Sequence, residues 1–414
     1  MNDTTEFIPL IPQYIKYAIP LFSLTIVIEF ILAKKRGKQD HYRVNDTINN
    51  LTMGIFSQIT DIIAGLTLFL TYAWIYKNYR LLTLENTWYI WIICYIAHDF
   101  LYYLFHLISH KVNIIWGSHE PHHSSEEFNY SVALRQGAFQ TFFSSPIFFF
   151  LAFLGFDPVM WLICGQLNLI FQFLPHTRLI GKLWWPIEFI FSTPSHHRVH
   201  HAKNPKYIDK NFGGTFIIWD RMFGTFKEEG DEEPVYGIIT PLKSWNPVWG
   251  QTKNWIMLFK RFLSMEGLLN KLKVLFFNPS WTPTGQNIAP EVSIKTYKKY
   301  GMESKGLHKN IYLIISFLFC SNTFLYFDLF VVSGLDKFLT ISFLIISLLS
   351  VGILLNNPNW AKKLEVTRIV TCTLIGFTYA FFILQSTLAS VFISVSGFIF
   401  LALFYYLYQN DFAN

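Results

Sequence analysis

Histidines recur in this chain at spacings that can bring several imidazoles to one metal ion. Three clusters, H-LIS-H, H-EP-HH and H-RV-HH, lie between residues 106 and 201. The eight histidines are His106, His110, His119, His122, His123, His197, His200 and His201. Spacings of three and four residues place side chains on one face of a helix that turns once per 3.6 residues. This number of imidazoles exceeds the needs of a four-coordinate zinc site and suits two transition-metal ions, whose identity the spacing leaves open.

Three other histidines lie in or near these clusters. His176 follows an apolar run in FLPHT, between the second and third clusters, and we predict that it is a ninth ligand. His196 would point about 100° away from His197 on a helix, so we expect it behind the ligands. His98 lies two helical turns before His106 and is expected to be a buried, hydrogen-bonded residue.

Carboxylates near the clusters are expected to orient the imidazoles by accepting their free N–H groups. The candidates are Asp99, Glu126, Glu127, Asp209 and Asp220. We assign Asp99 and Glu126 to the catalytic site on this basis. Each acid, taken singly, is as readily explained as an ordinary surface or interface residue.

The apolar runs of the chain predict an all-α polytopic membrane protein with about nine transmembrane helices. Of its 414 residues 52% are hydrophobic and 14% are charged, and a bilayer core of roughly 30 Å takes about 20 helical residues. The expected spans are Ile15–Leu32, Met53–Tyr76, Trp88–Ile108, Phe139–Phe156, Val159–Leu174, Ile311–Val331, Phe338–Leu355, Ile369–Leu384 and Val391–Leu407. Residues 1–305 would form the membrane-embedded catalytic domain, and 306–414 a C-terminal transmembrane bundle.

The basic loop KKRGKQDHYR, residues 34–43, is expected to face the cytoplasm, because cytoplasmic loops carry an excess of Lys and Arg. This orientation leaves the N-terminus outside and all three histidine clusters on the cytoplasmic side. The formal net charge of +6 is modest, and the chain has no basic repeat, so we expect no nucleic-acid partner.

The clusters lie next to apolar runs and among aromatic residues, a placement that suits a lipid substrate entering from the bilayer. We predict oxygen activation at a reduced metal pair and attack on an unactivated C–H bond. Non-specific metal capture by a histidine-rich loop is the competing interpretation, but such tracts are usually contiguous and disordered. A membrane metal-binding or transport protein is another, although transporters usually place their ligands near the bilayer midplane.

At these residues the sequence resembles the fatty acid hydroxylase and sterol desaturase superfamily of membrane di-iron enzymes. Its signature is HxxxH, HxxHH and HxxHH. The stretches HHSSEEFN, ALRQ and YIDKNFGG are similar to the ether-lipid-cleaving member of that superfamily. The similarity covers about Ile15 to Pro290, and the C-terminal spans only in general character.

The resemblance implies that the eight motif histidines hold two iron ions and that molecular oxygen is the oxidant. It also implies hydroxylation of the carbon next to the ether oxygen of an alkylglycerol-type membrane lipid, which yields a fatty aldehyde and a glycerol derivative. The ether-lipid member takes electrons from a tetrahydropterin. An acidic residue linked to pterin use follows its first HxxxH, where this chain has Lys111. A ferredoxin or cytochrome is therefore the alternative donor, and a hydroxylase or desaturase of sterol, carotenoid or acyl chains is the alternative activity.

Overall fold

The chain folds into helices. The computed structural model describes residues 14–284, 297–301, 306–330 and 334–408. Within these ranges the regular elements are helical, and the β-pairing consists of two isolated bridges, Phe191 with Phe216 and Ala202 with Tyr236. The prediction of an all-α fold is confirmed.

The helices form two compact units. Unit 1 comprises residues 1–43, 57–242 and 251–298, and unit 2 comprises residues 44–56, 243–250 and 299–414. The division expected from the sequence ran between residues 305 and 306, and residue 305 lies outside the described residues. Unit 2 also takes in two segments from the first 305 residues. Ile48 and Trp245 from these segments pack in one core with Tyr312, which explains their place in unit 2.

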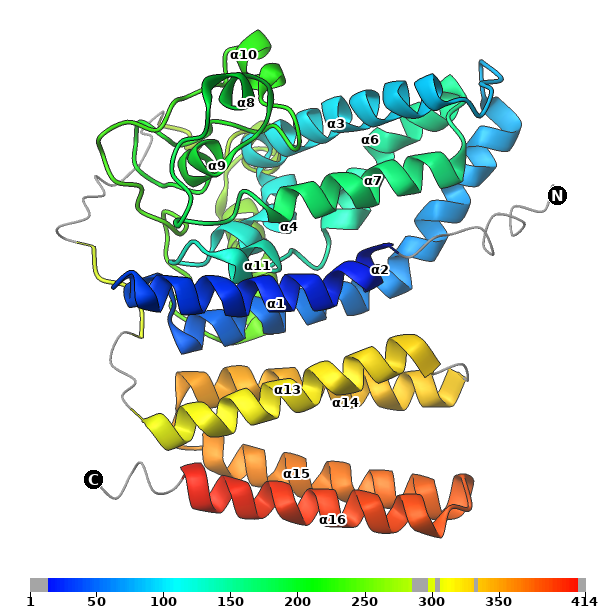
Figure 1. Cartoon of the computed structure of the whole chain (residues 1–414), viewed down its shortest axis with the longest axis vertical. Helices are drawn as coiled ribbons and strands as arrows, with labels where there is room; N and C mark the ends of the chain where they lie inside the picture. Colours follow the sequence, from blue (N-terminus) through cyan, green and yellow to red (C-terminus); the bar gives the residue numbers. More distant parts are fainter. Residues whose placement is uncertain (1–13, 285–296, 302–305, 331–333, 409–414) are drawn as a thin grey trace. The chain divides into compact units, whose positions relative to one another are not determined.

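Unit 1 is built around the long apolar helix α3 (Trp88–Lys111), which packs against α4, α6 and α7 (Figure 1). Its other helices of more than ten residues are α1 (Tyr14–Lys35), most of α2 (Val44–Tyr79), α4 (Asn113–His123), α6 (Gln140–Leu154), α7 (Pro158–Phe173) and most of α11 (Pro247–Ser264). Tyr72 and Trp161 stack in the core with ring centroids 4.2 Å apart. Buried Phe148 and Leu151 fill the same core, so apolar contacts fix the helices that carry the site.

A tight turn joins α6 to α7. Gly155 ends α6 with a φ of 97°, and a Cβ at this position would lie 2.1 Å from the carbonyl oxygen of Leu82. The side chain of Asp157 then caps α7 by accepting from the backbone N–H groups of Val159 and Met160 at 2.8 and 3.3 Å. Because the turn reverses the chain, α7 runs back along α3 and delivers His176 to the end where α3 finishes.

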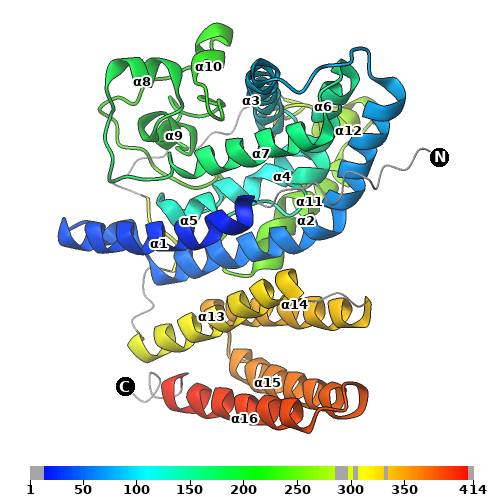
Figure 2. The same cartoon turned by 45° about the vertical axis from the view of Figure 1, so that its right-hand side comes forward.

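Short helices and loops gather near that end of α3 and α7 (Figures 1 and 2). They are α5 (Tyr130–Ala133), α8 (Trp185–Ile190), α9 (Pro194–His200), α10 (Ile218–Phe223) and α12 (Leu268–Phe276). The helix α9 begins with a capping box between Thr193 and His196, and Pro194 occupies its first position. These local signals start a helix just before the third histidine cluster.

Unit 2 contains four sequential helices in its C-terminal part, in which each helix packs against the next. They are α13 (Leu307–Phe330), α14 (Gly334–Asn356), α15 (Ala361–Thr378) and α16 (Thr387–Leu403), and the π-helical turns η3 (Tyr379–Ile383) and η4 (Phe404–Tyr408) extend the last two. Tyr312, Leu354, Ile369 and Phe404 contribute to their shared core.

Among the residues that the structure describes, five helices are long and apolar enough to cross a membrane, and six if the 45° bend within residues 39–79 divides a single span. The five are Tyr17–Lys35, Trp88–Lys111, Gly334–Asn356, Ala361–Ile383 and Thr387–Leu407. Helices α6 and α7 have 15 and 16 residues, or about 23 Å at 1.5 Å per residue, which is less than the bilayer core. The chain is a membrane protein, and nine spans remain a prediction; Val331, at the end of one of them, lies outside the described residues.

A buried ion pair ties three helices of unit 2 together. Arg368 donates from Nε and Nη2 to the carboxylate of Glu365 at 2.8 and 2.7 Å, and from Nη1 to Ser347 Oγ at 3.1 Å. Ser350 and Tyr312 also donate to Glu365. Charges are costly inside a membrane unless they are paired, and here the pair is surrounded by hydrogen bonds from α13 and α14.

We predict that Arg368→Met lowers the free energy of unfolding by about 3 kcal/mol, because it leaves the buried carboxylate of Glu365 without its cation. The double variant Glu365→Leu with Arg368→Met should recover most of this loss. Equilibrium denaturation in detergent micelles measures both effects. A single variant as stable as the wild-type chain would show that the pair is not needed for stability.

Candidate metal centre

Four segments of unit 1 bring the histidine clusters together. The first cluster ends α3, and α4 begins after the single residue Val112 and carries the second cluster in its last two turns. The third cluster occupies α9 and its C-terminal cap, and His176 follows α7. All nine imidazoles predicted as ligands are buried and lie in this one region.

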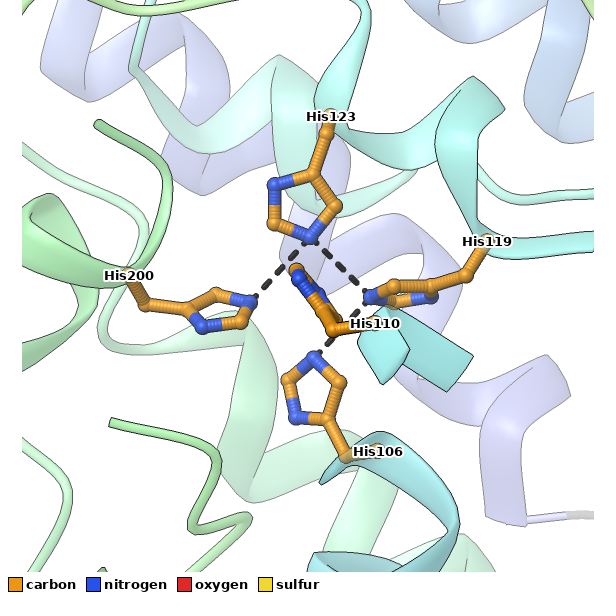
Figure 3. Close-up of side chains that lie close together, drawn as sticks. All are labelled: His106, His110, His119, His123 and His200. Atoms are coloured by element: carbon orange, nitrogen blue, oxygen red, sulfur yellow. Dashed lines mark hydrogen bonds between the residues drawn. The ribbon is translucent and has the colours of Figure 1, made fainter. Parts of the chain in front are cut away.

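The nine histidines form two sets that could each hold one metal ion. The first set is His106, His110, His119, His123 and His200, and the second is His122, His176, His197 and His201. Within each set, one ring nitrogen from every residue lies within 4.8 Å of the others. The rings of the first set turn toward one another in Figure 3. The neighbours His122 and His123 belong to different sets, so the second cluster contributes to both.

Hydrogen bonds to oxygen acceptors fix the protonation of five rings. The Nδ1 atoms of His106, His122, His176 and His200 lie 2.7–3.0 Å from backbone carbonyl oxygens, and His119 Nδ1 lies 2.9 Å from Gln140 Oε1. The carbonyl oxygens belong to Phe212, Arg135, Gln172 and Lys210 respectively. Because a carbonyl oxygen can only accept, Nδ1 must carry the proton in these rings. A neutral ring of this kind presents a lone pair at Nε2.

The Nε2 atoms then face one another at short range. In the first set, His119 Nε2 lies 2.9 Å from His106 Nε2 and 3.0 Å from His123 Nε2, and His200 Nε2 lies 3.1 Å from His123 Nε2. In the second set the separations between Nε2 atoms are 3.0–3.4 Å. Opposed lone pairs at such distances repel unless a cation lies between them. The donor set, imidazole throughout, therefore fits a transition-metal ion in each set.

The predicted acids lie at different distances from the rings. Asp209 is at the site: its Oδ1 is 3.5 Å from His110 Nδ1, and its Oδ2 is 2.5 Å from Lys111 Nζ. Its φ of 58° lies in the left-handed region, which Asp and Asn tolerate better than most residues. Burial raises the pKa of Asp209, but the hydrogen bond with His110 and the charge of Lys111 outweigh it and lower the pKa to about 2.

Asp99 and Asp220 bind the segment that follows α9, not the rings themselves. Asp99 accepts from the backbone N–H of Thr215 at 2.6 Å and from Trp219 Nε1 at 2.9 Å. Asp220 accepts from the backbone N–H groups of Phe212 and Gly213, both at 2.7 Å. These bonds position the Phe212 carbonyl group that accepts from His106. The prediction that Asp99 accepts directly from a ring N–H is therefore corrected: its partners belong to the loop.

Glu126 and Glu127 lie among cationic and phenolic partners. Glu127 forms ion pairs with Arg43 and Arg178 at 2.6 and 3.0 Å. Glu126 lies 3.6 Å from Arg43 Nη2 and accepts from the hydroxyl of Tyr297. Glu126 thus belongs to this network, and its catalytic role stays a prediction. The ring acceptors are mostly backbone carbonyls, which the sequence does not reveal.

The glycines of YIDKNFGG allow the loop to approach α3 closely. A Cβ on Gly214 would lie 2.8 Å from Asp99 Oδ1 and 2.7 Å from a ring carbon of Tyr102. A Cβ on Gly213 would lie 2.4 Å from the carbonyl oxygen of Phe216. Both positions therefore exclude larger residues if Asp99 is to bind the loop backbone.

The two other histidines near the clusters do not join either set. His196 Nε2 lies 3.1 Å from Glu188 Oε2, which confirms that this ring points away from its neighbours. His98 is buried and stacks on Phe148 with ring centroids 4.5 Å apart. Its Nδ1 has no hydrogen-bond partner in the described part of the chain, so the predicted hydrogen bond of His98 is absent at this atom.

Glu29, which the sequence analysis did not select, holds the segment after His176. It is buried in α1 and accepts from Thr177 Oγ1 at 2.5 Å, from the backbone N–H of Tyr130 at 2.8 Å and from the hydroxyl of Tyr42. Thr177 directly follows His176 of the second set. Glu29 could have been selected from the sequence because it is the single acid inside the apolar run 15–32. A charge within such a run is costly and usually has a structural or functional role.

Burial favours the neutral form of His119, His123, His176 and His197. It lowers the pKa of His176 from 6.5 to about 4. Burial, together with the neighbouring His110, lowers the pKa of His119 from 6.5 to about 3. The pKa values of His123 and His197 fall well below 6.5, first through burial and then through the neighbouring histidines. Neutral imidazole is the form that binds a metal, so the site is ready for ions at neutral pH.

Comparison with known proteins agrees with this geometry. The fatty acid hydroxylase family model matches residues 91–225, a range that contains all nine histidines. Alkylglycerol monooxygenase of Danio rerio is 34% identical over 408 residues, which cover 97% of this chain and 90% of the relative. The chain belongs to the fatty acid hydroxylase family. The resemblance drawn from the histidine signature is thus confirmed.

Other relatives within the fatty acid hydroxylase family carry the same name. Alkylglycerol monooxygenase of Homo sapiens is 34% identical, with 90% of this chain and 83% of the relative covered. The Caenorhabditis elegans protein of that name is 33% identical, with 89% and 77% covered. No solved structure matches the chain. These similarities make this member of the fatty acid hydroxylase family an oxygen-dependent lipid monooxygenase.

We predict that the metal-free protein loses stability as the pH falls below about 6.5. Unfolded histidines titrate near pH 6.5, whereas His176 and His119 titrate near 4 and 3 in the folded chain. Below pH 6.5 the unfolded chain therefore binds more protons. Each such histidine removes about 1.4 kcal/mol of stability per pH unit. Denaturation of chelator-treated protein between pH 5 and pH 8 measures this slope, and equal stability at pH 5 and pH 7 would contradict it.

We also predict that Glu29→Gln reduces metal binding by the second set more than by the first. The amide loses the carboxylate that holds Thr177 and Tyr130, so His176 is less well positioned. Metal analysis should show content falling from two ions per chain toward one. Glu85→Gln, at an exposed acid, is the matched control and should keep both ions. Full metal content in Glu29→Gln would contradict the proposed role of Glu29 in positioning His176.

Proposed function

We propose that this protein is a di-iron monooxygenase that hydroxylates the carbon next to the ether oxygen of alkylglycerol-type lipids. The observation that carries the proposal is the division of nine buried imidazoles into sets of five and four. The near full-length similarity to alkylglycerol monooxygenases supports the substrate class. The product would be a hemiacetal that separates into a fatty aldehyde and a glycerol derivative.

The chemistry of the ether explains the position of attack. Lone pairs on the ether oxygen stabilise electron deficiency at the adjacent carbon, which makes its C–H bond easier to break than others along the alkyl chain. The two histidine sets would hold the iron ions, which supply the activation of dioxygen that no amino-acid side chain provides.

The chain itself orients the rings and packs aromatic side chains against them. The carbonyl groups of Phe212, Arg135 and Gln172 keep three of the rings in one tautomer. Aromatic side chains pack against both sets: Trp116 lies 4.9 Å from His110, and Phe128 lies 5.6 Å from His176, between ring centroids. Such packing would limit the reaction of an oxidant with groups other than the positioned lipid.

The electron donor and the sidedness belong to the same proposal. We propose a tetrahydropterin as donor or, because Lys111 replaces the family's acid, a ferredoxin or cytochrome. Lys111 pairs with Asp209 beside His110, so its charge stands at the edge of the site. The basic residues that end and follow α1 support a cytoplasmic metal centre with the N-terminus outside.

A substrate panel tests this function. Full-length protein purified without oxygen in lipid nanodiscs should contain two iron ions per chain. On exposure to oxygen with a reductant, it should convert labelled 1-O-alkylglycerol to fatty aldehyde. A fatty acid and a sterol offered side by side should give little product. Parallel reactions with tetrahydropterin, ferredoxin and a cytochrome identify the donor, and oxidation of only the sterol or fatty acid would refute the ether-lipid assignment.

We predict that His122→Ala loses iron and turnover while membrane insertion is unchanged. The variant removes one of four imidazoles from the second set. The loss of activity should exceed the roughly 10–100-fold that is typical for residues that merely orient a ligand. His308→Ala, at an exposed position on α13, is the control and should behave like the wild-type protein. Normal iron content and turnover in His122→Ala would refute its assignment as a ligand.

A further inference from the structure

A cavity of about 800 Å³ lies beside the first histidine set. His110, His123 and His200 from that set form part of its wall, together with His201 from the second set. The volume is within the range of 300–1,000 Å³ that is usual for small-molecule sites. A molecule in this cavity would therefore lie directly against the metal centre.

Cationic side chains outnumber acids on the cavity wall. The cations are Lys111, Lys203, Lys253 and Arg261, and the acids are Glu120 and Asp209. Lys111 and Asp209 form an ion pair at 2.5 Å and offset each other. The remaining three cations share the wall with a single acid, Glu120. The wall therefore carries a net positive formal charge, which favours an anionic ligand.

Two of these cations are deeply buried. Lys203 is 4% exposed and Lys253 is 8% exposed. Lys253 Nζ donates to the carbonyl oxygens of Thr240 and Pro241 at 2.6 and 3.2 Å, which leaves one of its three N–H groups for another acceptor. Lys203 Nζ lies 3.6 Å from the ring centroid of Tyr297. Its acidic neighbour Glu126 is shared with Arg43 and Tyr297. Buried ammonium groups with such partners favour an additional anionic acceptor.

Apolar side chains complete the cavity and continue outside it. Trp116, Met257, Leu258, Phe277 and Trp281 lie on the wall. Beyond it, α11 and α12 expose the apolar residues Phe259, Leu263, Leu268, Leu269 and Leu272 among the lysines 260, 271 and 273. Exposed apolar residues interspersed with lysines are typical of helices that lie in a membrane interface. A ligand of this cavity should therefore be an amphiphile from the membrane.

We propose that this cavity binds the phosphate of a lipid head group, with Lys203 and Lys253 as its anchors. The ligand would be a single-chain ether lipid that carries a phosphate on its glycerol. The apolar wall takes the part of the alkyl chain next to the ether, so that the carbon beside the ether oxygen approaches the metal centre. This inference rests on the proposed function for the identity of the lipid, but binding of the phosphate can be measured without turnover.

Equilibrium binding to the full chain in nanodiscs of neutral lipid tests the proposal. The probes are 1-O-hexadecylglycerol 3-phosphate, neutral 1-O-hexadecylglycerol and inorganic phosphate. Loss of one charged hydrogen bond should weaken binding of the phosphate lipid at least about tenfold in Lys253→Met and in Lys203→Met. Binding of the neutral lipid should change less than about twofold. Lys260→Met, at an exposed lysine of α11 outside the cavity wall, should change neither affinity.

Each outcome is decisive. Equal weakening for both lipids, or no weakening in either cavity variant, overturns the phosphate site. Inorganic phosphate that binds as tightly as the phosphate lipid also overturns the head-group assignment. Lysine-dependent binding of the phosphate lipid supports the site even if no aldehyde forms, in which case only the proposed function fails. Thermal unfolding of both variants shows whether they are folded, and the two lysines provide independent tests.

Discussion

Hydrogen bonds from imidazole N–H groups to backbone carbonyl oxygens are the constraint on which the metal centre depends. They put the proton of each anchored ring on Nδ1 and turn Nε2 toward the centre of its set. Within each set, buried lone pairs on Nε2 atoms therefore face one another at about hydrogen-bond distance. Such an arrangement is unfavourable by itself, so folding of the site and binding of cations are linked. The rest of unit 1 holds the carbonyl groups in place.

Two short connections between helices bring the histidines of unit 1 together. The single residue between α3 and α4 sets the first cluster against the second, and the hairpin of α6 and α7 returns the chain to deliver His176. Asp99 and Asp220 fasten the loop after α9, which supplies the carbonyl group of Phe212. Two of the acids that appeared to be ring partners from the sequence are therefore one step removed from the rings.

The sequence predicted well which histidines come together, because helical periodicity determines which side chains share a face. The spacing of three and four residues selected eight of the nine histidines, and the position of His176 after an apolar run indicated the ninth. The division into five and four could not be predicted, since it depends on how the last turn of α4 sends His122 and His123 to opposite sides. The ring acceptors were missed because a backbone carbonyl has no signature in a sequence. Hydropathy predicted the membrane class, but it did not predict that the helices α6 and α7 would be shorter than those long enough to cross a membrane.

Anchoring by the main chain also changes what sequence variation can reveal. The residues that supply the carbonyl groups, Arg135, Gln172, Lys210 and Phe212, do so whatever side chain they carry. At the partly buried residues Gln172 and Lys210, truncation of the side chain leaves the anchoring group in place, so an alanine scan would pass over it. The side chains of Arg135 and Phe212 are fully buried, and Phe212 packs against His106, so truncation there would also disturb the packing. Disturbance of the centre from Gln172 or Lys210 requires a change in the path of the backbone itself. An insertion beside either residue, or a proline that redirects its peptide plane, would act where alanine does not.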